Sequence, residues 1–121
     1  MFNLNELQNH YRWKIIVKMP KNGSFEKIPV YVNYFRLPHD EKLQLLNEID
    51  KAQGMHALES EDKMLNQIFQ GWDEGEIKNG KENLPNTEEN RQKLLNISEF
   101  RLAIMEGFLA SMGGDKGKSN A

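Results

Sequence analysis

The feature that most constrains this chain is an alternating run followed by a turn signal. From Tyr11 to Met19 every second residue is apolar, the pattern of a β-strand with one buried face. Asn22-Gly23 then supplies residues that tolerate positive φ in a tight turn, and a second β-rich run, FEKIPVYVNYF, follows. The sequence therefore predicts a β-hairpin over residues 11–35.

The turn also predicts which residues of the two strands face each other. A two-residue loop pairs positions whose numbers sum to 45, and four consecutive apolar pairs then share one face: Tyr11 with Tyr34, Trp13 with Val32, Ile15 with Val30, and Val17 with Ile28. The same register places Lys18 opposite Lys27, which is unfavourable, so a longer loop of the same parity is an alternative. An isolated hairpin is marginal in water, so helices or another chain must cover the apolar face.

The opposite face of the hairpin is not wholly polar. It carries Ile16, Tyr31 and Phe35 among charged residues. Two interpretations stay open. These are scattered exposed apolar residues of an ordinary surface, or they form a contact surface with an open strand edge that can pair with another subunit.

Four helical segments follow the hairpin. The first carries leucines from Leu43 and is capped by Asp40, the second begins near Ser60 and ends at Trp72, and short and long helices start at Thr87 and Ser98. The fold class predicted is α+β, with an N-terminal β-hairpin packed against three to four α-helices. We expect a single domain over residues 1–112 and a disordered, flexible C-terminal tail over 113–121.

The last helix, Glu99 to about Met112, has an apolar arc wider than one packing stripe. Either the helix is central to the core, or part of the arc serves a partner. Under the second interpretation, the partner-binding residues are the apolar residues of its second half and the outer residues of the hairpin: Ile104, Met105, Phe108, Leu109, Met112, Ile16, Tyr31 and Phe35.

Composition and charge narrow the setting. The 121 residues include no cysteine, no apolar run long enough to span a bilayer and no signal-peptide pattern, so we expect a cytoplasmic protein without a membrane partner. Residues 1–38 hold six Lys or Arg against two Glu, and residues 39–62 hold two against seven Asp or Glu. This surplus is too small to predict nucleic-acid binding. The basic and acidic patches are solvated faces, or they meet within one subunit or between neighbours.

The residues that carry catalysis or bind metals are not arranged for either role. The acidic loop after Trp72 lacks the spacing of a calcium-binding loop, since its sixth position is Lys78 rather than glycine. His10, His39 and His56 lie in separate segments, and no glycine-rich phosphate loop stands between a strand and a helix. We therefore expect no metal, no cofactor and no enzymatic activity, and we interpret the loop from Trp72 to Thr87 as a connection between helices.

The order of short motifs is similar to that of a known family. A basic hairpin ends in Phe35-Arg36-Leu37-Pro38, and an acidic helical region leads to a Gly71-Trp72 pair. After a loop carrying Gly80 come three further motifs: Leu84-Pro85-Asn86-Thr87-Glu88-Glu89-Asn90, Leu94-Leu95, and Phe100-Arg101-Leu102-Ala103-Ile104. Over roughly residues 11–112 the chain resembles the tail assembly chaperones of long-tailed bacteriophages and prophages.

This resemblance implies a non-catalytic role in viral tail morphogenesis. Proteins of the family bind the long tape measure protein, keep it soluble, and are displaced as tail tube subunits polymerise around it. The resemblance thus implies a tape measure protein as partner, an indirect relation to the tail tube protein, and the cytoplasm of the bacterial host as location; self-association is also expected. The alternative is a structural adaptor, such as a tail-completion or head–tail connector subunit that is retained in the virion.

Overall fold

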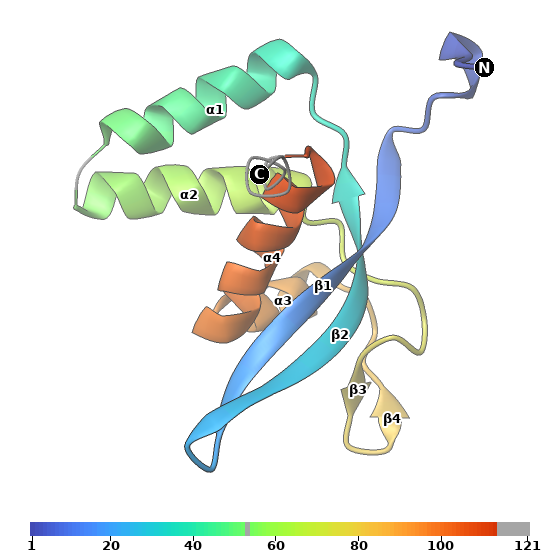
Figure 1. Cartoon of the computed structure of the whole chain (residues 1–121), viewed down its shortest axis with the longest axis vertical. Coiled ribbons are helices and arrows are strands. Elements are labelled where there is room, and N and C mark those ends of the chain that lie inside the picture. Colours follow the sequence, from blue (N-terminus) through green and yellow to red (C-terminus); the bar gives the residue numbers. More distant parts are fainter. Residues whose placement is uncertain (53, 114–121) are drawn as a thin grey trace, which may run out of the picture.

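The computed structural model describes residues 1–52 and 54–113, and its fold is α+β (Figure 1). A long β-hairpin is followed by two helices, a small second hairpin and two further helices. In chain order the elements are the 3-10 helix η1 (Leu4–Glu6), β1 (His10–Lys21), β2 (Ser24–Phe35), α1 (His39–Lys51), α2 (Met55–Ile68), β3 (Lys78–Asn79), β4 (Glu82–Asn83), α3 (Glu88–Leu95) and α4 (Ser98–Ser111).

The first hairpin has the predicted two-residue turn and the predicted register. β1 and β2 pair antiparallel, with Tyr11 opposite Tyr34 and the unfavourable Lys18–Lys27 pair included. Asn22 and Gly23 both have positive φ, 52° and 83°, which is the requirement of the tightest hairpin turn. The longer-loop alternative is therefore wrong. The turn residues outweigh one like-charge pair at the solvated end of the hairpin.

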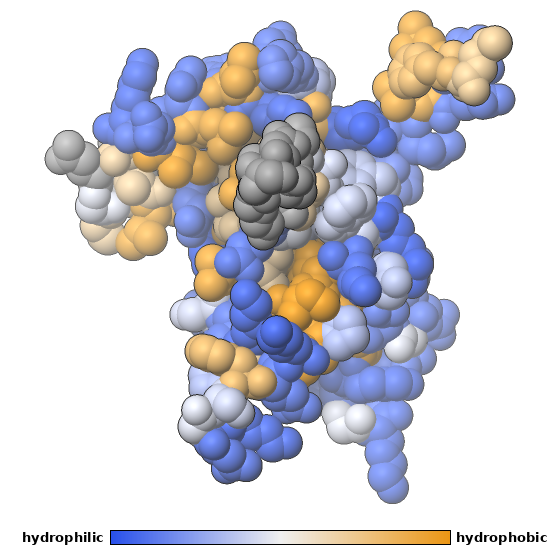
Figure 2. Space-filling model, in the orientation of Figure 1, coloured by the Kyte–Doolittle hydropathy of each residue, from blue (hydrophilic) through white to orange (hydrophobic). Residues whose placement is uncertain are grey.

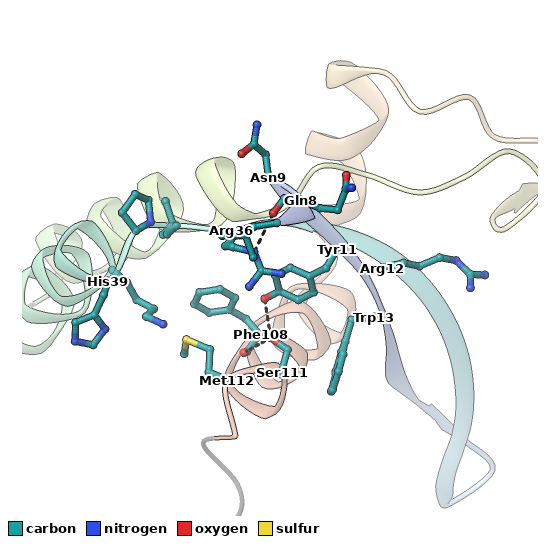
Figure 3. A pocket seen from close by; sticks show the side chains of 14 residues that line it. Gln8, Asn9, Tyr11, Arg12, Trp13, Arg36, His39, Phe108, Ser111 and Met112 are labelled. Atoms are coloured by element: carbon teal, nitrogen blue, oxygen red, sulfur yellow. Dashed lines mark hydrogen bonds between the residues drawn. The ribbon is translucent and has the colours of Figure 1, made fainter. Parts of the chain in front are cut away.

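One face of the hairpin forms a layer of the core. Ile15, Val17, Val32 and Tyr34 are buried there, and the buried residues of the molecule form one continuous cluster with α2 and α4. The predicted face was wrong at two positions, because Trp13 and Ile28 are each 37% exposed. Ile28 lies toward the tip of the hairpin, which extends beyond the helices (Figure 1). Trp13 stands beside the last turn of α4 rather than under the helix (Figure 3).

Helix α4 crosses β1 at Gly107. A Cβ at Gly107 would lie 2.4 Å from Ile15 Cγ2 and 2.6 Å from the Tyr34 hydroxyl, so only glycine permits this approach. The Tyr34 hydroxyl donates a 2.7 Å hydrogen bond to the carbonyl of Ile104 in the same helix. The wide apolar arc of α4 is thus largely explained by its central position.

The number of helices was predicted, but three of their starts were not. α1 begins at His39, one residue before the predicted cap Asp40, and α2 begins at Met55 rather than near Ser60. Ser98 is the first residue of α4, with Ile97 at the cap position and no side-chain cap bond. Thr87 is the N-cap of α3 as predicted, since its hydroxyl accepts a 3.2 Å bond from the amide of Asn90.

The loop after Trp72 connects helices and also covers a sheet edge. Asn33 of β2 exchanges two 2.8 Å backbone bonds with Gln70 and Gly71, so this segment lines the outer side of β2. The Trp72 indole N–H donates to the carbonyl of Leu84 at 2.8 Å, which ties the two ends of the loop together. Within the loop, the short β3–β4 hairpin was not predicted.

Two further predictions concern the C-terminal tail and membrane-spanning helices. The predicted tail over 113–121 lies outside the described residues except for Gly113. Within the described ranges, no helix combines the length and the apolar character needed to cross a membrane.

Candidate functional site

A groove opens between the start of β1, the start of α1 and the last turn of α4 (Figure 3). We call it the basic groove. Its volume is about 890 Å³. The apolar part of its lining comes from six side chains of four separate segments: Leu7, Tyr11, Trp13, Leu37, Phe108 and Met112. The groove is therefore assembled by the fold and not by any one stretch of sequence.

Tyr11 is held in place at the centre of this groove. Its hydroxyl lies 2.7 Å from Ser111 Oγ, and Ser111 Oγ donates a 2.7 Å bond to the carbonyl of Phe108. Since the Ser111 hydroxyl already donates its proton to that carbonyl, the Tyr11 hydroxyl is the donor in the bond to Ser111 Oγ. The Tyr11 ring packs against Tyr34, with ring centroids 5.7 Å apart. Tyr11 thus joins β1 to the end of α4 and forms a rigid apolar surface.

The charge around the groove has one sign. Arg12, Arg36, His39 and Lys42 line it, and no carboxylate of the described residues does. The Arg36 guanidinium lies 5.1 Å above the Tyr11 ring and donates from Nε to the carbonyl of Gln8 at 3.0 Å. Arg12 points away from the groove (Figure 3), toward Asp73 at 3.5 Å and Glu76 at 3.9 Å. Arg36 and Lys42 therefore dominate its potential, which favours acidic groups on a partner.

Apolar side chains also stand exposed next to the groove. The N-terminal arm, residues 1–9, extends away from the body, with hydrophobic residues at its tip (Figure 2). Phe2 and Leu4 in the arm are strongly exposed, and Leu109 on α4 is 41% exposed. Single exposed apolar residues are common on protein surfaces, and the described arm residues that line the groove are Leu7, Gln8 and Asn9.

The structure separates the predicted residues of α4 into two groups. Met112 lines the basic groove, Leu109 is exposed, and Met105 is half-buried. Phe108 borders the groove but is only 2% exposed, so it is a core residue and its predicted contact with a partner is corrected. Ile104 has no exposed surface at all, because it packs into the core where α4 meets Tyr34. Ile104 is therefore a core residue, and its predicted contact with a partner is corrected.

The three predicted residues of the hairpin do not join that surface. Tyr31 lies under the Arg12 guanidinium, 4.0 Å from its ring centroid, and Phe35 is half-buried against the core. Ile16 is half-buried and lines a different groove, on the other side of α4. Ile16, Tyr31 and Phe35 therefore do not form one continuous contact surface.

Sequence reasoning missed several residues of the basic groove. Trp13 was predicted to be buried, and Arg36, Lys42 and the arm residue Leu7 were given no role in a site. The available signal was the occurrence of large apolar residues in a polar N-terminal stretch. The approach of β1, α1 and α4 to one another, which forms the groove, has no local signature.

One titratable side chain, that of Tyr34, is buried in the core. Burial, and then the neighbouring Tyr11, raise the pKa of the Tyr34 hydroxyl above its usual value, so Tyr34 acts as a structural hydrogen-bond donor. Among residues 1–52 and 54–113, no three His, Asp or Glu side chains come close enough to hold a metal ion.

No family model, curated protein or solved structure matches this chain. Functional inference therefore depends on the geometry of the basic groove and on the order of the sequence motifs.

Proposed function

We propose that this protein is a non-catalytic tail assembly chaperone of a long-tailed phage or prophage. It binds the tape measure protein and keeps it soluble in the bacterial cytoplasm until tail tube subunits assemble around it. The observation that carries the proposal is the basic groove, an open apolar surface with cationic margins and no carboxylate in its described lining. The order of the sequence motifs supports the same conclusion.

The dimensions of the groove suit an amphipathic client helix. An α-helix is about 10–12 Å wide and rises about 5.4 Å per turn, so a groove of about 890 Å³ accommodates roughly two turns. Helix-in-groove binding places the apolar stripe of the client against side chains such as Tyr11, Trp13 and Met112. Arg36 and Lys42 then face the acidic residues that flank such a stripe.

The mode of binding fits a temporary coat. Each copy offers a small contact, so single contacts are weak and reversible, whereas many copies along a long client hold it collectively. Displacement by the tail tube then requires only that each contact be lost in turn. A flexible methionine such as Met112 adapts to different client side chains, which a repeated but inexact helical stripe requires.

Co-expression with the tape measure protein tests this proposal. Wild-type chain should move the tape measure protein from the pellet to the soluble fraction. The double variant Trp13→Ser/Met112→Ser removes apolar surface from the groove and should lose most of this effect. Phe25→Ser is the control, because Phe25 is exposed near the tip of the first hairpin and does not line the groove.

Two results would count against the proposal. A tape measure protein that stays insoluble at comparable wild-type expression removes its main support. Detection of this chain in purified particles by mass spectrometry would favour the structural adaptor instead, since an assembly chaperone is absent from finished virions.

A further inference from the structure

The outer edge of β1 is an unpaired strand edge. In an antiparallel pair, alternate residues point their N–H and C=O groups toward the partner strand. Tyr31 and Asn33 of β2 point outward, because their amides donate to Glu76 Oε1 at 2.7 Å and to the Gly71 carbonyl at 2.8 Å. The Arg36 amide points inward and donates to the Asn9 carbonyl at 2.7 Å. By the register, the even residues of β1 therefore point outward.

The two outer edges of the hairpin differ in whether another segment covers them. The edge of β2 is covered by the segment around Gln70, Gly71 and Glu76. No described backbone or side-chain group bonds the outward amides of Lys14, Ile16 and Lys18 on β1. This stretch is thus a free template for another strand, which natural proteins normally block.

A groove beside this edge leaves room for an added strand. We call it the edge groove; its volume is about 300 Å³, and it lies between β1 and α4. Hydrophobic residues gather between these two elements, with hydrophilic residues around them (Figure 2). On the α4 side its lining includes Ala103, which is buried, and Gly107, which packs against Ile15. Ala110 also lines it and is half-buried, so a small side chain stands at the margin of the groove.

The charges at the edge groove select the partner. Lys14, Lys18 and Lys27 line it, and within the described residues none of the three makes an ion pair. Glu106, on the α4 side, is the one carboxylate of the described lining. Pairing with β1 of a second copy about Ile16 would oppose Lys14 to Lys18, which is destabilising. Charge complementarity therefore favours an acidic strand over a second copy.

We propose that the edge of β1 from Lys14 to Lys18 binds an extended acidic peptide segment by strand addition. Side chains of the added strand alternate between the two faces of the sheet. Residues opposite Lys14 and Lys18 are acidic, and the residue between them, opposite Ile16, is apolar. Residues on the other face are uncharged and lie toward Ala103, Gly107 and Ala110. This site is distinct from the basic groove, and its partner need not be the client bound there.

Amide hydrogen exchange of the full chain, measured by NMR with the synthetic peptide TEVVVET, tests the proposal. The amides of Lys14, Ile16 and Lys18 should exchange about tenfold more slowly when the peptide is present at ten times its Kd. The amides of Trp13, Ile15 and Val17 already bond β2 and should change little. The charge-reversed peptide TKVVVKT is the control and should give no protection. Protection without this alternation would overturn strand addition.

Two variants separate the backbone contribution from the charge contribution. Ile16→Pro removes one outward amide and keeps every charge, and it should weaken peptide binding at least as strongly as Lys14→Gln/Lys18→Gln. Ile16→Val is its matched control and should bind like wild type. If Ile16→Pro fails to fold, the lysine variant and the exchange pattern still decide. Binding of single-stranded oligonucleotide with equal lysine dependence, but no alternating protection, would contradict the proposal.

Discussion

At the scale of single residues, the contact between α4 and β1 depends on the missing side chain of Gly107. Alanine normally stabilises a helix interior by about 1 kcal/mol relative to glycine. Here the added methyl would lie 2.4 Å from Ile15 Cγ2, and overpacking of this kind costs about 1–3 kcal/mol. The steric cost exceeds the helix gain, so Gly107→Ala should lower the free energy of unfolding by up to about 2 kcal/mol in urea denaturation.

Glu106→Ala provides the comparison for that experiment. Glu106 is exposed one residue away on the same helix, so its replacement should change stability by less than about 0.5 kcal/mol. A Gly107→Ala chain as stable as wild type would show that α4 can shift away from β1 without loss.

Tyr34 gives a prediction with a pH dependence. Its buried hydroxyl bonds the Ile104 carbonyl, so Tyr34→Phe should cost about 1 kcal/mol at neutral pH. The raised pKa keeps this hydroxyl protonated in the folded chain, whereas in the unfolded chain it ionises near pH 10. The stabilisation is therefore complete below about pH 10 and falls by about 1.4 kcal/mol per pH unit above it.

The measurement compares wild type and Tyr34→Phe by urea denaturation from pH 8 to pH 11. The lysines titrate in both chains, so their effect cancels in the difference. The deficit of Tyr34→Phe should shrink above pH 10 and reach zero about one unit higher, since 1.4 kcal/mol exceeds the lost hydrogen bond. A constant deficit across this range would mean that the hydroxyl ionises in the folded chain as easily as in the unfolded chain.

At the scale of elements, the stability of α3 depends on its N-cap residue, Thr87. The helix has only eight residues and is too short to be stable alone, so its cap and its packing through Leu95 hold it. Thr87→Ala removes the bond to the Asn90 amide and should lower the free energy of unfolding by about 1 kcal/mol. Thr87→Ser keeps the hydroxyl and should stay within a few tenths of a kcal/mol of wild type. Equal losses of stability in Thr87→Ala and Thr87→Ser would show that the methyl group of Thr87, rather than its hydroxyl, stabilises the helix.

Some features of these elements could be predicted from the sequence, and others could not. The hairpin register was predictable because two independent signals, the Asn22-Gly23 turn and the apolar alternation, agreed. The start of α2 was not, because Ser60 has the chemistry of a cap but lies within a run of good helix formers beginning at Met55. Gly54, with φ of 60°, ends the connection and allows the helix to begin at once.

The candidate site was less predictable than the fold, for a physical reason. Apolar periodicity identified α4 but could not separate Ile104, which meets β1, from Leu109, which meets solvent. That division depends on the angle at which α4 crosses the hairpin, which is set by Gly107 and its neighbours. The lining of the basic groove comes from residues as far apart as Leu7 and Met112, which no local pattern links.

At the scale of the whole molecule, exposed apolar side chains occur in several regions, and two of these regions adjoin a groove. One comprises the N-terminal arm and the basic groove. The other lies where the start of α2 meets the α3–α4 junction, with Met55, Leu58, Ile97 and Leu102 exposed. A coat of many copies requires surfaces of this kind, for the client and for neighbouring copies. The two regions differ in charge, since Glu59 and Asp62 line a groove in the second.

The arm provides the last prediction, because it carries apolar surface without supporting the core. The described backbone bonds of its first seven residues are local, from Glu6 to Asn3 and from Leu7 to Leu4, whereas Gln8 and Asn9 accept bonds from Arg36 of the body. Removal of residues 1–6 should therefore change the free energy of unfolding by less than about 0.5 kcal/mol. It should nevertheless reduce the solubilisation of the tape measure protein, because it removes the exposed apolar side chains of Phe2 and Leu4.

The full-length variant Phe2→Ser/Leu4→Ser is the matched control for the truncation. It keeps the length and charge of the arm, so an equal reduction in solubilisation assigns the effect to the two apolar side chains. The soluble fraction of the tape measure protein and the urea denaturation midpoint should be measured on the same preparations. A truncated chain that solubilises the client as well as wild type would confine client binding to the groove, and a large fall in the midpoint would show that the arm packs on the body.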